Sequence, residues 1–207
     1  MLRDIFRKLY PFAIFTLPSP LPSGKGGGEA SRAVYLTFDD GPIPEVTPKV
    51  LAVLDRYHVK ATFFMVGENI HKHPDIYRMV AAAGHSIGNH TYNHLKGWRC
   101  TYRRYLRNVS RFPVETRLFR PPYGKTTLLQ RWLLARKGYK IIFWDILTRD
   151  YDARRTPEAM FDLIRKRTRP GSIINFHDSL KSNERMLAVL PKTIEWLQQQ
   201  GYELRPI

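Results

Sequence analysis

The sequence is poor in cysteine, with Cys100 as the only one among 207 residues. A single cysteine excludes an internal disulfide and a metal cluster held by several thiolates. The sequence also lacks a glycine-rich phosphate-binding loop and an internal repeat. Its length suits one domain with a sizeable hydrophobic core.

Acidic residues are scarce as well, because 18 Asp and Glu stand against 34 Lys and Arg and give a formal net charge of +16. Such a charge favours anionic partners, which include acidic glycans, anionic membranes and nucleic acid. Arginines cluster at 99–117 and at 165–169, where a helix end accounts for the second cluster. Neither cluster carries a nucleic-acid recognition motif. We therefore expect no nucleic-acid partner, and we keep an anionic cell-wall glycan and peripheral contact with an anionic membrane open.

Apolar runs are short throughout the sequence, and none is long enough to span a membrane as a helix. The run at 9–17 is interrupted by Pro11 and is followed by no usual signal-peptide cleavage site. We expect an N-terminal arm and a Pro/Gly/Ser linker in residues 1–32, and one main domain in residues 33–207. A packed arm is favoured over an interfacial anchor. A cytoplasmic or membrane-peripheral location is slightly favoured over export.

From residue 33 onward, signals for strands and helices alternate. Strands are expected at 33–36, 61–66, 86–89, 118–120, 140–144, 172–176 and near Leu204, and helices after an N-cap at Thr47, at 74–83, at 126–136, from 156 to just before Pro170, and at 192–200. Such alternation predicts an α/β fold with a parallel sheet and helices outside it. About seven strands favour closure into a distorted, TIM-like (β/α) barrel over an open doubly wound sheet. The active site is then expected at the C-terminal ends of the strands.

Two adjacent carboxylates, Asp39 and Asp40, follow the first of these strands and precede Gly41-Pro42. Successive side chains of a strand point to opposite sides of the backbone. One carboxylate can therefore bind a cation while its neighbour handles a proton. An ordinary acidic turn is the alternative, and the other residues of the chain must decide between the two.

Two histidines, His90 and His94, are spaced four residues apart after the expected strand at 86–89. On a helical turn, both imidazoles would lie on one face and could share a metal ion with a carboxylate. This spacing alone is weak evidence, because surface histidines often have it. The remaining histidines are interpreted as surface or packing residues, namely His58, His71, His73 and His85.

Three further polar residues follow expected strands. Arg120 precedes two prolines and can orient a carboxylate. Asp150 follows the expected strand at 140–144, and His177 follows the strand at 172–176. A histidine with a carboxylate partner can act as a general acid. Each residue alone could instead have a structural role, but their joint appearance at strand ends makes that explanation weak.

The sequence resembles the polysaccharide deacetylases, the NodB-homology group of carbohydrate esterase family four. The five ordered motifs of that family occur at 37–42, 90–94, 120–123, 150–151 and 174–177. Two motifs depart from the family pattern, since Tyr151 replaces a tryptophan and Ile174 replaces a leucine. The resemblance implies a distorted (β/α) barrel and a hydrolase that removes an N- or O-acyl group from a sugar with the help of a metal ion.

The resemblance also implies the roles of the metal ligands and the base. Asp40, His90 and His94 would bind a divalent metal, most often zinc, with cobalt, nickel or manganese as alternatives. The metal would acidify water and polarise the acyl carbonyl. Asp39 would be the general base, oriented by Arg120.

The roles of the acid and of the aromatic residues follow in the same way. His177, oriented by Asp150, would protonate the leaving amine. The backbone N–H of Tyr123 would stabilise the oxyanion. Trp144 and Tyr151 are candidates for stacking on sugar rings. For Trp144, a role in the core is an equally good interpretation.

Several functions remain open at this stage. The leading one is deacetylation of an amino-sugar polysaccharide such as peptidoglycan or a chitin oligosaccharide. A lipid-linked or small amino-sugar is the alternative substrate. An inactive glycan-binding module would not need Asp39 and His177, and a structural zinc domain would close its site with four protein ligands.

Overall fold

The computed structural model describes residues 11–17 and 32–207 and arranges them around one parallel sheet. The strands are β1 (Ala13–Ile14), β2 (Ala33–Asp39), β3 (Thr62–Met65), β4 (Ser86–Asn89), β5 (Leu118–Phe119), β6 (Lys140–Ile142), β7 (Ile146–Leu147), β8 (Ile173–His177) and β9 (Glu203–Leu204). They follow the order β1-β6-β5-β4-β3-β2-β8-β7, with β9 beside β2. The expected distorted (β/α) barrel is confirmed, with nine strands in its sheet where about seven were expected.

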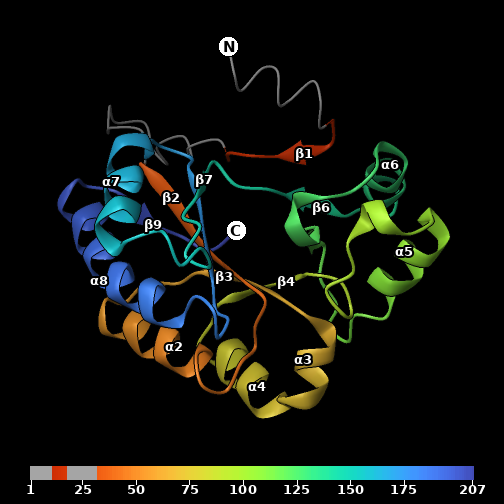
Figure 1. Ribbon diagram of the computed structural model, residues 1–207, viewed down its shortest axis with the longest axis horizontal. Helices are drawn as coiled ribbons and strands as arrows, with labels where there is room; N and C mark the ends of the chain where they lie inside the picture. The colour runs from red at the N-terminus through yellow and green to blue at the C-terminus, as the bar shows by residue number, and fades with distance from the viewer. Residues whose placement is uncertain (1–10, 18–31) are drawn as a thin grey trace, which may run out of the picture.

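The helices lie outside the curved sheet (Figure 1). They are α2 (Thr47–Arg56), α3 (Gly67–Lys72), α4 (Pro74–Ala82), α5 (Tyr102–Ser110), α6 (Leu128–Arg136), α7 (Pro157–Arg167) and α8 (Asn183–Gln199). Helices α5 and α6 lie together on the right of Figure 1, and α7 and α8 lie on the opposite side. No helix in the described ranges is both long and apolar enough to cross a bilayer.

Strand β2 lies in the middle of the sheet, and all seven of its residues are buried. Phe38 of β2 stacks between Phe63 of β3 and Phe176 of β8, at centroid distances of 5.0 and 5.8 Å. This register also pairs Asp39 with His177 at the C-terminal ends of β2 and β8. The apolar core of the sheet therefore brings two of the candidate site residues together.

Part of the expected N-terminal arm belongs to the sheet. Strand β1 pairs in parallel with β6, and Thr16 forms an antiparallel bridge with Ser172 just before β8. Leu17 N–H also donates a hydrogen bond to the Gly171 carbonyl at 3.0 Å. The expected linker at 18–28 lies outside the described residues. The division of the chain at residue 32 stays a prediction.

Two expected helix starts are wrong. Helix α2 takes Val46 as its N-cap, and Thr47 is the first helical residue, because its hydroxyl instead bonds to Asp178 and accepts from Ile43 N–H. Helix α8 begins at Asn183 rather than 192 and continues through Pro191. Its buried side chains before the proline outweigh the hydrogen bond that Pro191 cannot make.

Besides β1, three elements were not predicted from the sequence. Helices α3 and α5 occupy stretches to which the sequence pattern assigned no element, and β7 is only two residues long. Helix α5 is difficult to recognise because three arginines obscure its buried stripe of Tyr105 and Val109. Asp150 therefore follows β7, rather than the strand at 140–144.

Candidate active site

Asp39 is the last residue of β2 and is 2% exposed. Its Oδ1 accepts a hydrogen bond from Arg120 Nη1 at 2.7 Å, and its Oδ2 accepts one from Asn175 Nδ2 at 3.0 Å. Hydrogen bonds to both oxygens fix the carboxylate in one orientation. Charge-assisted bonds of this kind also favour the ionised form of a carboxylate.

Arg120 follows β5 and is completely buried. Besides Asp39, its guanidinium donates to Thr37 Oγ1, Asn175 Oδ1 and the carbonyls of Ile142 and Phe143. Burial lowers the pKa of Arg120, and the Asp39 carboxylate opposes that effect. An arginine keeps its charge under such conditions because its ordinary pKa is so high. The Arg120 side chain therefore connects β2, β5, β6 and β8 directly beneath the site.

Asn175 and Thr37 were not recognised from the sequence as members of the site. Both lie in buried strands, and Thr37 Oγ1 donates at 3.0 Å to either Asn175 Oδ1 or the Ile174 carbonyl. An asparagine between Ile174 and Phe176 was the available signal, because a polar residue in a fully buried strand needs a partner. That partner is the Asp39–Arg120 pair.

Asp40 lies beside two imidazoles in the group that could hold a metal ion. Its Oδ1 is 3.1 Å from His94 Nε2 and 3.7 Å from His90 Nε2. The ligand atoms of all three residues lie within 4.8 Å of one another. Burial raises the pKa of Asp40, but the hydrogen bond with His94 and the charges of the nearby histidines lower it by more. The pKa of Asp40 is therefore well below its usual range.

The protonation of His90 also suits a metal ligand. Its Nδ1 is 2.8 Å from the Arg120 carbonyl, which can only accept, so Nδ1 carries the proton and Nε2 keeps its lone pair. Burial lowers the pKa of His90 to about 4, which keeps the ring neutral. A carbonyl behind the far nitrogen of a ligand histidine is the usual means of fixing its tautomer. The donor set therefore fits a divalent cation.

The expectation that His90 and His94 share a helical turn is wrong. Residues 90–94 form an irregular turn in which Thr91 and His94 have φ values of 67° and 56°. The turn is held by Asn89 Oδ1, which accepts from Thr91 N–H at 2.8 Å, and by Thr91 Oγ1, which accepts from Leu95 N–H at 2.9 Å. The two rings still converge, with centroids 5.1 Å apart.

His177 ends β8 and forms a pair with the completely buried Asp150. Its Nδ1 donates to Asp150 Oδ1 at 2.7 Å, and its backbone N–H donates to Asp150 Oδ2, also at 2.7 Å. Arg185 Nε holds the Asp150 carbonyl at 2.8 Å from the start of α8. Burial lowers the pKa of His177, but the Asp150 carboxylate raises it more, to about 9. The imidazole is therefore protonated at neutral pH.

Two of the three aromatic candidates are exposed. Tyr123 is 60% exposed, with φ of 60°, and its ring lies 4.7 Å from that of His94. Tyr151 is 45% exposed and meets the His177 ring edge-on at 5.0 Å. Trp144 is half-buried and packs on the core beneath Gly124. Both tyrosines can therefore contact a bound sugar, whereas the contacts of Trp144 are mainly structural.

Asp178 is a further buried carboxylate that the sequence did not single out. It accepts hydrogen bonds from Gly41 N–H at 3.0 Å and from the Thr47 hydroxyl at 2.6 Å. Burial raises the pKa of Asp178 to about 8. A Cβ atom at Gly41 would lie 2.0 Å from Asp178 Oδ2, so only glycine fits there. Asp178 thus fixes the backbone immediately after Asp40.

Of the other histidines, His85 is the clearest packing residue. It is buried, accepts a hydrogen bond from Ala61 N–H at 3.1 Å and packs against Phe63. Burial lowers its pKa to about 4. It is therefore a neutral member of the core.

The sequence matches the family model described as polysaccharide deacetylase over residues 26–142. It is 32% identical to a chitooligosaccharide deacetylase of a Bradyrhizobium species, with 88% of this chain and 92% of that protein covered. It is 31% identical to a peptidoglycan-N-acetylglucosamine deacetylase of Bacillus cereus, with 83% and 84% covered. The family model covers Asp39, Asp40, His90, His94 and Arg120 and ends before Asp150 and His177.

Solved structures give the same result. A crystallised peptidoglycan N-acetylglucosamine deacetylase in complex with an N-oxidanyl-benzamide superposes with a TM-score of 0.83 at 29% identity, covering 95% of this chain and 91% of that one. A pseudoenzyme of carbohydrate esterase family four from Bacillus anthracis has a TM-score of 0.79 at 23% identity, with 97% and 69% covered, and shows likeness of fold alone. On its motifs, its barrel and these relatives, the chain belongs to the polysaccharide deacetylase family of hydrolases, which act on carbon–nitrogen bonds other than peptide bonds.

Proposed function

We propose that this protein removes N-acetyl groups from an N-acetylglucosamine-containing glycan of the peptidoglycan or chitin-oligosaccharide type. The main observation behind this proposal is the position of two buried ion pairs, Asp39–Arg120 and His177–Asp150. Asp39 and His177 end the adjacent strands β2 and β8, next to the group of possible metal ligands that contains Asp40. Relatives that act on chitooligosaccharides and on peptidoglycan support this substrate class. A base, an acid and a cation site within one rim are what hydrolysis of an amide requires.

The cation site consists of Asp40, His90 and His94. Three protein ligands leave coordination positions open, as catalytic rather than structural zinc sites do. A divalent metal bound there would supply Lewis acidity to water and to the acyl carbonyl. We propose zinc, because two imidazoles and one carboxylate suit it well. Metal analysis of the purified protein tests this choice against cobalt, nickel and manganese.

Asp39 acts as the general base in this proposal. Its carboxylate is held in place by Arg120 and Asn175, and each of its oxygens retains a lone pair to accept a proton. The charge-assisted hydrogen bond from the buried Arg120 guanidinium holds the Asp39 carboxylate in one orientation before the reaction. After proton uptake, the hydrogen bonds keep the carboxyl group in position for the next turnover.

His177 acts as the general acid. The leaving group of an amide is an amine, which departs far more readily when protonated than as an anion. The Asp150 carboxylate keeps the His177 imidazole charged at neutral pH. The same pair fixes the ring through Nδ1, so Nε2 is the atom that can deliver the proton.

The Tyr123 backbone N–H is the proposed oxyanion donor. Its left-handed conformation follows Pro121 and Pro122, which restrict the backbone before it. The exposed ring of Tyr123 contacts His94, and the exposed ring of Tyr151 contacts His177. The two tyrosines would therefore contact a bound sugar from different sides. Trp144 is proposed as a support for this wall.

The test is acetate release by the purified protein, with and without added zinc. Suitable substrates are a chitin oligosaccharide, purified peptidoglycan, monomeric N-acetylglucosamine and a lipid-linked amino-sugar. We expect release from a polymeric substrate, and release slower by about 10² to 10⁴ with the Asp39→Asn variant. Glycan binding without acetate release by the zinc-loaded protein would show an inactive binding module instead.

An anionic cell-wall glycan is the proposed natural partner. The net charge of +16 would attract such a polymer and increase the rate of encounter. Attraction of this kind weakens as salt screens the charges. Hydrolysis of an anionic glycan should therefore slow with ionic strength more than hydrolysis of a neutral chitin oligosaccharide.

A further inference from the structure

The outer face of α6 is apolar, although it faces solvent. Leu128, Leu129 and Trp132 are 56%, 46% and 39% exposed. These positions share one side of the helix, while Leu134 points into the core from the other side. A surface helix normally places polar residues outward. Helix α6 therefore has an exposed apolar face, on which the Arg136 guanidinium lies 5.0 Å from the centre of the Trp132 ring.

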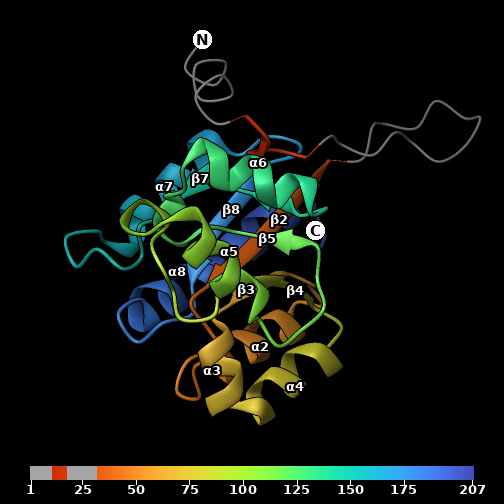
Figure 2. The same ribbon diagram turned by 90° about the vertical axis from the view of Figure 1, so that its right-hand side faces the viewer.

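Two aromatic side chains extend this face toward α5. Trp98 is 53% exposed, and its indole N–H donates to the Thr126 carbonyl just before α6 at 2.8 Å. Tyr102 is 38% exposed at the start of α5. Figure 2 shows α5 and α6 at the front of the same side of the molecule. We name the exposed residues Trp98, Leu128, Leu129 and Trp132 the α6 patch.

The positive charge of the chain is concentrated on this side. Residues 96–140 contain 13 Lys and Arg but only one acidic residue, Glu115, whereas the rest of the chain contains 21 basic and 17 acidic residues. Of these 13, only Arg120 and Arg131 are buried. Most of the +16 net charge is thus displayed around α5 and α6.

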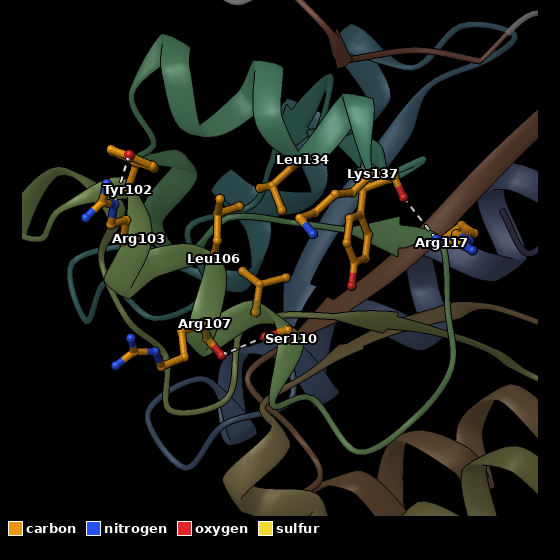
Figure 3. A pocket seen from close by; sticks show the side chains of 10 residues that line it. Tyr102, Arg103, Leu106, Arg107, Ser110, Arg117, Leu134 and Lys137 are labelled. Atoms are coloured by element: carbon orange, nitrogen blue, oxygen red, sulfur yellow. Dashed lines mark hydrogen bonds between the residues drawn. The ribbon is translucent and has the colours of Figure 1, made fainter.

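A basic groove of about 650 Å³ lies between α5 and α6. It is lined by the cations Arg103, Arg107, Arg117 and Lys137 and by Tyr102, Leu106, Val109, Ser110, Leu134 and Tyr139. Figure 3 shows Lys137 extending from the end of α6 toward Leu106 across the groove. No carboxylate is among these lining residues. The groove can therefore accept a phosphate at its rim with an apolar group beneath it.

We propose that the α5–α6 side docks on an anionic lipid bilayer, with the α6 patch at the interface and lipid phosphates against the basic groove. Tryptophan and leucine beside lysine and arginine are typical of interfacial membrane helices. A glycan would use the flat face of an aromatic ring, but it gains little from two exposed leucines. The observations therefore favour lipid over carbohydrate as the occupant. This role is separate from hydrolysis and does not depend on the substrate.

The charge component is tested by sedimentation of the protein with vesicles of phosphatidylcholine, with and without phosphatidylglycerol. Arg103→Gln/Arg107→Gln/Lys137→Gln removes three exposed charges from the groove. Its matched control, Arg165→Gln/Lys166→Gln/Arg167→Gln, removes three exposed charges from α7 on the opposite side. The groove variant should bind phosphatidylglycerol vesicles on the order of 100-fold more weakly, since each basic residue near such a surface contributes about 1 kcal/mol. The α7 variant should lose much less.

The apolar component is tested with Leu128→Gln/Leu129→Gln/Trp132→Gln. Glutamine keeps the helix propensity and the charge, and the Thr127–Gln130 capping box of α6 stays in place. The control is Met79→Gln, which changes an exposed side chain on α4. The α6 variant should lose vesicle binding and keep deacetylation of a soluble chitin oligosaccharide, whereas the control should keep both. Melting curves check that each variant is folded.

Several results would overturn the proposal. Equal losses in the groove and α7 variants would make the attraction a property of net charge alone. Vesicle binding by the α6 variant at wild-type strength would show that its apolar face does not enter the interface. If the protein bound a soluble polyanion more tightly than phosphatidylglycerol vesicles, the α5–α6 side would be a binding surface for an anionic polymer. A wild-type dimer that the α6 variant dissociates would assign the patch to a second copy of the chain.

Discussion

Replacing Asp150 by Asn is the sharpest test of the acid assigned to His177. Asp150 is completely buried, and both of its carboxylate oxygens accept hydrogen bonds from His177. Asparagine has nearly the same shape but no charge. It also has one acceptor oxygen instead of two, so one His177 N–H would face an amide donor. The change therefore removes the field of the carboxylate and also leaves one poorly matched buried contact.

The magnitude follows from the pKa of His177. That pKa is about 9, against an ordinary value of 6.5, because Asp150 outweighs the effect of burial. The difference corresponds to roughly 3 kcal/mol of stabilisation of the imidazolium. In Asp150→Asn, the contributions of Asp150 are lost while Asp39 and Asp40 still oppose burial, so the pKa of His177 should fall toward its ordinary value of 6.5. At about pH 8, such a histidine is only a few per cent protonated, so amide hydrolysis should fall by about 30-fold or more.

The assay is the pH dependence of kcat/KM on an amide substrate and on an activated ester. For the wild type, the alkaline limb should lie near pH 9, and for Asp150→Asn it should move toward pH 6.5. Ester hydrolysis should change much less, because its leaving group needs little protonation. A limb that stays near pH 9 in the variant would refute the electrostatic role and leave Asp150 with a structural one.

Stability gives an independent measurement of the same pair. The folded-state pKa of His177 lies above its unfolded value, so the pair stabilises the fold fully below pH 6.5 and loses this contribution as the pH rises through about 9. The difference in Tm between the wild type and Asp150→Asn should therefore shrink at alkaline pH. The mismatched N–H leaves a constant difference of about 1–3 kcal/mol in the free energy of unfolding.

The other predictions concern the cation site, the base and the turn that joins them. His90→Ala should lose both bound metal and activity, and full metal occupancy in that variant would contradict the ligand assignment. Asp39→Asn should keep the metal and lose about 10² to 10⁴ in turnover; loss of metal instead would mean that the two aspartates have exchanged roles. Gly41→Ala should lower Tm and activity together, because its Cβ would overlap Asp178, and an unchanged Tm would contradict this packing.

The sequence predicted the barrel and the positions of the motifs because both depend on local patterns. Apolar runs and turn residues identify strands such as 61–66, and polar residues directly after strands mark one rim of a parallel barrel. The elements that were missed have weak local signals. Helix α5 carries three arginines, and α8 contains Pro191, so in both cases burial against neighbouring elements determines the helix.

The contacts beneath the site could not be predicted, because they depend on which strands are neighbours. Asn175 and Asp39 are far apart in the sequence and meet only because β8 pairs with β2. Arg120 reaches the same pair from β5, across the interior of the curved sheet. This contact is possible only because the sheet is curved, which brings the side chains of β5 and β2 together on its inner face.

The strand order also explains why base and acid can work on one substrate. Asp39 and His177 are paired residues of β2 and β8, and adjacent parallel strands lie about 5 Å apart. Each carries its own buried partner, Arg120 or Asp150, that stabilises the charged form required at the start of the reaction. Because Arg120 and Asp150 come from different segments, a change at one should leave the hydrogen bonds of the other pair intact, although Asp39 also raises the pKa of His177. Asp39→Asn should therefore lower turnover across the whole pH range, whereas Asp150→Asn should act mainly by shifting the alkaline limb.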